Sequence, residues 1–106
     1  MKAIRVVLCS CPDERVAQEL ATGLVEARLA ACVNVLPQIR STYRWQGAVC
    51  DETESLMVIK TGATRLAALQ EWLVGHHPYD VPEVVALPVE QGLPAYLEWV
   101  ARETSS

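Results

Sequence analysis

Cysteines and histidines are the side chains of this sequence best suited to bind a transition-metal ion. Cys9 and Cys11 lie near the N-terminus, and His76 and His77 are adjacent to each other much later in the chain. Thiolate and imidazole ligands suit copper and zinc, and sulfur favours Cu(I). The sequence has no compact C-x-x-C or H-x-x-x-H spacing. An alternative therefore stays open, in which Cys9 fills a strand end and the histidines are loop residues.

Two interpretations of Cys11 follow from its position. Side chains two apart on a strand point to the same face, so Cys9 and Cys11 would together offer two thiolates to Cu(I). Alternatively, Cys11 belongs to the start of a helix and points elsewhere, because Pro12 and Asp13 are typical of a first helical turn.

The hydrophobic pattern predicts the elements that must position these residues. Apolar runs with a period of two indicate strands, and apolar residues three and four apart indicate helices. A strand bent at Pro37 is followed by a tight turn at Gln46-Gly47, and Gly75 is expected to end the second helix. The predicted strands are 3–9, 32–36 continuing as 39–45, 48–60 and 84–89, and the predicted helices are 12–29, 64–74 and 94–102.

This order predicts one α+β domain over residues 1–106, a ferredoxin-like βαββαβ sandwich with a C-terminal helix. Its long β-hairpin must extend beyond the core and expose strand edges, which favours a partner chain.

The same topology brings the cysteines and histidines together. The first strand and the strand before the second helix run antiparallel in this fold, so Cys9 and the pair His76-His77 are expected at one edge of the sheet, with Cys11, Tyr79 and Asp80 nearby. Adjacent residues usually point apart. A single ion bound by both histidines would therefore need an irregular backbone, or one histidine would bind an ion with a neighbouring subunit.

Composition excludes several classes of function. The net charge is −4 and there is no cluster of Lys and Arg, which argues against a nucleic-acid partner. No stretch approaches the roughly 20 apolar residues of a membrane span. The chain begins as a strand rather than as a signal peptide, so we expect a cytoplasmic protein whose four cysteines are thiols.

Nothing in the sequence indicates an active site. Glu52 and Glu54 share a strand face, but general acid–base chemistry needs a pocket, so we interpret that face as solvated or as a subunit contact. A Cys9–His77 nucleophile is conceivable, yet no oxyanion hole accompanies it. We therefore expect a protein that is not an enzyme.

Three islands of sequence together resemble the CutA family, the small proteins named for divalent-cation tolerance. Their order and spacing carry the resemblance over about residues 4–100. The islands are Ala30-Ala31-Cys32-Val33-Asn34 with Pro37, Ser41, Tyr43, Trp45 and Gly47; Glu54 with Lys60-Thr61; and His76-His77-Pro78-Tyr79-Asp80-Val81-Pro82-Glu83 with Gly92 and Tyr96-Leu97-Glu98-Trp99.

The resemblance implies a homotrimer of ferredoxin-like subunits with a role in the response to heavy metals. It also implies metal ligands at Cys9, His76 and His77, with copper as the ion and zinc or another divalent cation as alternatives. Cys11 is not part of the family pattern, so for this residue we favour the helix-start interpretation.

A second function from a different class stays open. Trimeric signalling proteins of the PII type share this architecture and bind small ligands between subunits. The chain would then be a signalling or scaffold protein that binds a small ligand or a protein partner, without a physiological metal. It lacks a Gly-rich phosphate cradle, which argues against nucleotide binding.

Overall fold

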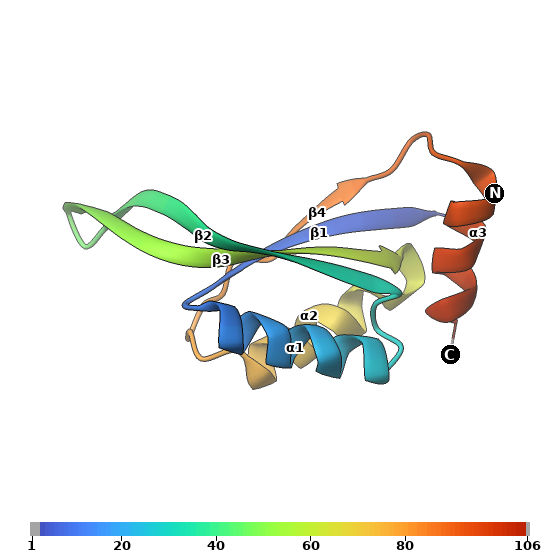
Figure 1. Cartoon of the computed structure of the whole chain (residues 1–106), viewed down its shortest axis with the longest axis horizontal. Coiled ribbons are helices and arrows are strands. Elements are labelled where there is room, and N and C mark those ends of the chain that lie inside the picture. The colour runs from blue at the N-terminus through green and yellow to red at the C-terminus, as the bar shows by residue number, and fades with distance from the viewer. Residues whose placement is uncertain (1–2, 106) are drawn as a thin grey trace.

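A four-stranded antiparallel sheet with helices α1 and α2 on one face forms the fold, as Figure 1 shows. The computed structural model describes residues 3–105, so residues 1, 2 and 106 of the predicted domain lie outside it. The strand order β2-β3-β1-β4 is that of the ferredoxin-like sandwich and confirms the predicted fold class. The elements are β1 Ile4–Cys11, α1 Glu14–Glu26, β2 Cys32–Trp45, β3 Ala48–Gly62, the short 3₁₀ helix η1 Ala63–Arg65, α2 Leu66–His76, β4 Val85–Pro88 and α3 Pro94–Glu103.

The main core lies between the sheet and these two helices. Alternate residues of β1 point toward the helices, because side chains on a strand alternate between its faces. The fully buried members of this core include Val7, Cys9 and Cys11 of β1, Met57 and Ile59 of β3, Leu24 of α1, and Leu69 and Leu73 of α2.

Helix α1 begins later and ends earlier than the predicted range of 12–29. Asp13 is its N-cap, with an extended backbone and a carboxylate that accepts a 2.8 Å hydrogen bond from the Val16 N–H. Pro12 therefore precedes the cap and does not lie in the first turn. At the other end Arg28 takes a left-handed conformation with φ of 59°, which stops the helix after Glu26.

The β2–β3 hairpin is as long as predicted and extends past the helices, as Figure 1 shows. The bend expected at Pro37 is a change of register between Leu36 and Ile39 within one continuous strand. Gln46 and Gly47 make the turn with positive φ angles of 49° and 81°. Near this turn Trp45 is 60% exposed.

The sequence pattern predicted that the second helix ends at Gly75, but α2 is longer. It continues to His76, and the extended backbone of His77 closes it. The His77 N–H donates a 2.8 Å hydrogen bond to the carbonyl of Leu73, which completes the last turn. The change from helical to extended backbone falls between the two histidines, so their rings leave the chain in different directions.

A second, smaller core joins the two ends of the described chain. Ile4 of β1, Ala31 and Val100 of α3 are buried together at the end of the sheet away from the hairpin tip. Thr104 is 1% exposed, and its Oγ1 accepts a 3.2 Å hydrogen bond from the Gly62 N–H and donates one of 2.8 Å to the Val100 carbonyl.

The second face of the sheet carries no helix over most of its length in the described residues (Figure 1). Val85 and Leu87 of the edge strand β4 are 47% and 46% exposed there, and Leu36 of β2 is 43% exposed. By pairing register, Val85 lies opposite Leu8 and Leu87 opposite Val6, so these apolar side chains share one face. These residues make this part of the open sheet face apolar, whereas the opposite face is covered by α1 and α2.

Candidate metal centre

The thiols of Cys9 and Cys11 point to the same buried face of β1. Cys9 pairs across the sheet with Met57 and Cys11 with Ser55, which places both cysteines on the side of the helices. Both residues are 0% exposed. Cys11 is thus the last residue of the strand, and the interpretation of it as a helix-start residue that points elsewhere is wrong.

His77 meets this cysteine pair from the far end of α2. Its Nε2 lies 2.9 Å from the carbonyl oxygen of Ser10, the residue between the two cysteines. The Sγ atoms of Cys9 and Cys11 and a ring nitrogen of His77 all lie within 4.8 Å of one another. The expectation that the ends of β1 and α2 meet at one edge of the sheet is therefore confirmed for Cys9 and His77.

His76 lies outside this cluster. Its ring stacks on the exposed side of α2 against Trp72, with ring centroids 3.9 Å apart and an angle of 14° between the planes. Its Nδ1 is 2.8 Å from the carbonyl oxygen of Trp72. The structure brings together Cys9 and His77 of the three predicted ligands, adds Cys11, and turns His76 away within the same chain.

The two thiols differ in acidity because they interact with each other. The hydrogen bond to Cys11 raises the pKa of Cys9 most, followed by burial and by the negative charges of Cys11, Glu83 and Glu54. The same hydrogen bond lowers the pKa of Cys11, against the opposing effect of burial. Cys11 is therefore the thiol that ionises first.

Both ring nitrogens of His77 are hydrogen-bonded. The Tyr79 N–H donates to Nδ1 over 3.0 Å, so Nδ1 is the acceptor and Nε2 carries the proton donated to Ser10. An ion bound to His77 would replace one of these hydrogen bonds. With that exchange, two sulfurs and one imidazole form a donor set that fits a soft ion such as Cu(I), or Zn²⁺ with a further ligand.

A carboxylate lies beside the cluster and was not anticipated there. Glu54 is only 9% exposed, rather than solvated, and its Oε2 accepts a 2.6 Å hydrogen bond from the Tyr79 hydroxyl. Burial, this hydrogen bond and the charges of Glu54, Glu52 and Cys11 raise the pKa of Tyr79. Tyr79 was expected near the cysteines, but the strand pattern of β3 gave no sign that its neighbour Glu54 is buried.

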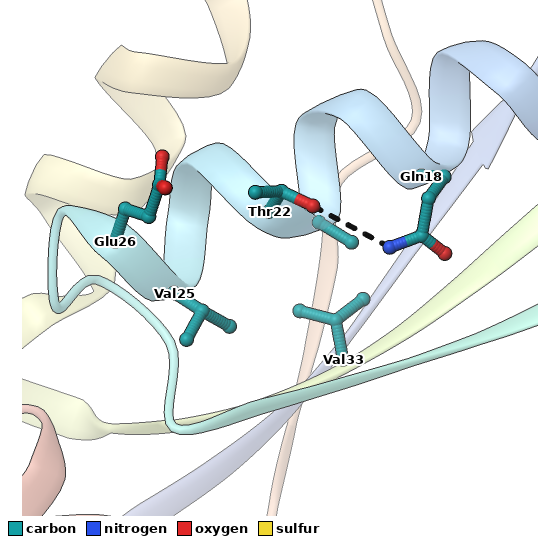
Figure 2. A pocket seen from close by; sticks show the side chains of 6 residues that line it. Gln18, Thr22, Val25, Glu26 and Val33 are labelled. Atoms are coloured by element: carbon teal, nitrogen blue, oxygen red, sulfur yellow. Dashed lines mark hydrogen bonds between the residues drawn. The ribbon is translucent and has the colours of Figure 1, made fainter.

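A separate shallow cavity of about 280 Å³ lies between α1 and the start of β2. Figure 2 shows its lining, in which the Gln18 amide donates a 3.4 Å hydrogen bond to the Thr22 hydroxyl. The cavity shares no residue with the cysteine cluster, and Glu26 supplies the carboxylate of its lining. Its lining residues are Gln18, Ala21, Thr22, Val25, Glu26 and Val33. Among the described residues, no helix is both long and apolar enough to span a membrane.

Comparison with known proteins gives a consistent family match. The family model described as CutA1 divalent ion tolerance protein matches residues 5–103. The divalent-cation tolerance protein CutA of Thermus thermophilus is 48% identical over 99 residues, which are 93% of this chain and 96% of the relative. The protein CutA of Mus musculus is 50% identical over 104 residues, which are 98% of this chain but 59% of the relative. The chain thus spans about three-fifths of the animal relative that it matches.

Solved structures extend the match to the fold. The solved structure of the divalent cation tolerance protein from Thermus thermophilus has a TM-score of 0.94 and 46% identity, and the match covers 96% of this chain and 99% of that protein. The crystal structure of CutA1 from Oryza sativa has a TM-score of 0.95 and 41% identity and covers 98% of this chain and 95% of its own.

Proposed function

Because the chain belongs to the CutA1 divalent ion tolerance family, we propose that it binds a soft metal ion and contributes to the tolerance of heavy metals. Copper(I) is the ion that we propose first, with zinc or another divalent cation as the alternative. The observation that carries the proposal is the cluster of Cys9, Cys11 and His77, whose donor atoms lie within 4.8 Å of one another. No catalytic reaction is part of the proposal.

Two sulfurs and one imidazole favour copper over harder cations. Soft thiolates select Cu(I), whereas carboxylate and water ligands suit magnesium and calcium. Glu54 and Glu83 influence Cys9 through their charge, and this negative surrounding helps a cation to replace the thiol protons. We assign His76 no ligand role in its own subunit. A role with a neighbouring subunit stays a prediction, which the experiment below tests.

We also propose that the functional form is a homotrimer. The open apolar sheet face with Val85 and Leu87, and the exposed hairpin with Trp45, support this proposal. Such surfaces are usually covered by another protein chain, and long unpaired edges favour pairing. The proposal involves no nucleic acid and no membrane. It requires reduced thiols, which a reducing compartment such as the cytoplasm maintains.

Competition with a colorimetric Cu(I) chelator tests the metal site. The reduced wild type should bind about one Cu(I) per subunit, and Cys9→Ser, Cys11→Ser and His77→Ala should each weaken binding at least about tenfold. Cys50→Ser and His76→Ala are the matched controls, because Cys50 lies in the hairpin and His76 stacks on Trp72. Both controls should bind like the wild type.

The outcomes separate the proposed ligand sets. Loss of binding in His76→Ala with retention in Cys11→Ser would replace the proposed set by Cys9, His76 and His77. Negligible binding by the wild type would contradict the metal function as a whole. The PII-like trimer that binds a small ligand or a protein partner would then be the better description.

A further inference from the structure

Cys9 and Cys11 form a pair of thiols whose geometry suits more than metal binding. We propose that they close into an intrastrand disulfide when the protein is oxidised by a small hydroperoxide. Their Sγ atoms lie within 4.8 Å of each other on one face of β1, with only Ser10 between them in the chain. The disulfide itself follows from the geometry of the two thiols, whereas its effect on metal binding rests on the proposed function.

Strand geometry allows the bond but makes it strained. Two residues of a strand advance the chain by about 6.6 Å, which lies near the upper end of the Cα separations of about 4.4–6.8 Å seen in disulfides. The sulfurs must approach to about 2.05 Å, so β1 must shorten locally near its end. A strained disulfide is easily reduced, which is a property of regulatory rather than structural disulfides.

The oxidation balances with one hydroperoxide per pair. The sulfur of Cys11 attacks one oxygen of hydrogen peroxide, the O–O bond breaks, and a sulfenic acid and one water form. The sulfur of Cys9 then attacks the Cys11 sulfur, the S–O bond breaks, and the hydroxyl leaves as a second water with the Cys9 proton. The pair loses two electrons and two protons to the peroxide, and no other reactant is needed.

The segment that places His77 beside the pair is not part of a helix or strand. Residues 77–84 run from the end of α2 to β4 without regular structure, and His77 fixes the segment to the Ser10 carbonyl over 2.9 Å. Local opening of such a segment costs less free energy than opening of the core. Peroxide is small enough to reach Cys11 at the end of β1 during such an opening, although both thiols are buried in the closed form.

The disulfide would act as a switch on the proposed metal site. It removes both sulfur ligands at once, because a metal ion binds thiolate and not disulfide sulfur. The oxidised protein would keep only His77 of the three donors. An oxidant would thus release the ion, and a thiol reductant would restore binding.

Mass spectrometry of the protein treated with hydrogen peroxide tests the proposal. A Cys32→Ser/Cys50→Ser variant leaves Cys9 and Cys11 as the remaining cysteines. This variant should lose about two daltons and both reactive thiols. Without reductant its mass should stay that of a single chain, and dithiothreitol should restore the original mass and both thiols. Adding Cys11→Ser should instead leave Cys9 without a disulfide partner and abolish the loss of mass. His77→Ala should speed the reaction, and His77→Gln, which keeps an amide donor for Ser10, should react more like the parent.

Three results would overturn the inference. They are unchanged thiols at peroxide concentrations that oxidise Cys50 in the wild type, oxidation to sulfinic acid without the loss of two daltons, and disulfide formation only after the circular dichroism of the fold is lost. Cu(I) affinity of the oxidised form gives a separate readout and should fall at least about tenfold. A disulfide that forms in a protein without Cu(I) affinity would refute the metal function and leave the redox pair standing. Cu(I) binding by a protein that forms no disulfide would refute the redox pair and leave the metal function standing.

Discussion

At the scale of single residues, the two adjacent histidines have opposite roles. His77 is 7% exposed and holds both Ser10 and the Tyr79 N–H, whereas the ring of His76 lies on the surface of α2. Because His77→Ala leaves a buried carbonyl and an N–H without their partner, we expect it to lower the free energy of unfolding by about 1–3 kcal/mol. His76→Ala should change it by less than about 0.5 kcal/mol. Urea unfolding of the metal-free protein compares the two, and equal losses would refute the assignment.

Tyr79 gives a prediction that depends on pH. Its pKa is raised in the folded protein by burial and by Glu54, while a tyrosine of the unfolded chain ionises near pH 10. A raised pKa stabilises the fold below pH 10, and this contribution is lost as the pH rises toward the folded value. The wild type should therefore exceed Tyr79→Phe by about 1 kcal/mol at pH 7 and by progressively less above pH 10. Thermal unfolding of the two proteins at pH 7 and above pH 10 measures this difference in stability. A difference that grows with pH would contradict the prediction.

Sequence reasoning predicted where this cluster lies but did not identify all three of its residues. The approach of Cys9 and His77 followed from topology, because the strand order brings the ends of β1 and α2 to one edge. Cys11 was expected nearby but was set aside as a ligand, because it is not part of the family pattern and Pro12 and Asp13 resemble a helix start. The strand in fact continues to Cys11. His76 was included because the CutA resemblance implies both histidines as ligands. The backbone change at the end of α2 turns it away within its own chain, and a role with a neighbouring subunit stays a prediction.

At the scale of elements, the contact between α1 and α2 depends on a glycine. A Cβ added to Gly23 would lie 2.7 Å from two atoms of the Trp72 ring, and His76 stacks on the same ring. The ring has little freedom to move away, so Gly23→Ala should destabilise the protein by about 1 kcal/mol despite its gain in helix propensity. Gly75 is the matched control, because a Cβ there meets nothing within 4 Å.

Gly75→Ala should stabilise α2 by about 0.5–1 kcal/mol, because alanine loses less conformational freedom in a helix. Denaturant midpoints of both variants measure the contrast. A loss in Gly75→Ala, or a gain of the same size in Gly23→Ala, would contradict this account of the helix contact.

For the helices and strands, the sequence pattern predicted the elements better than their boundaries. The type and order of the predicted strands and helices match the structure. Hydrophobic periodicity is clear in α1 and α3, whereas the apolar residues of α2 are spread around the helix. The boundaries were less certain: Gly75 was expected to end α2, but its backbone stays helical and the helix ends only after His76. Thr104 lies beyond the predicted helix of 94–102, and its burial against Gly62 depends on a contact between residues that are distant in sequence.

At the scale of the whole molecule, the exposed hairpin and the open sheet face belong to the proposed trimer. Trp45 near the hairpin tip and Val74 on α2 are both 60% exposed. A glutamate at an interface buries a charge without a partner, whereas one on a solvent-exposed helix does not. Trp45→Glu should therefore give monomers or aggregates with a lower melting temperature, and Val74→Glu should keep the assembly of the wild type.

Size-exclusion chromatography with light scattering distinguishes these results. A soluble trimer of unchanged thermal stability in Trp45→Glu would refute the role of this side chain in assembly. Dissociation in Val74→Glu would instead place the interface on the helical side of the sheet.

The small core of Ile4, Ala31 and Val100 has a consequence for how the protein is made. It joins the first strand to the last helix, and Thr104 adds a hydrogen bond to the end of β3. During synthesis β1 leaves the ribosome long before α3 does, so Ile4 stays uncovered until α3 has emerged. Domains generally fold as units once they are complete. The small core should therefore close only after α3 has emerged, and a ribosome stalled before Val100 would hold a chain that proteases still cleave.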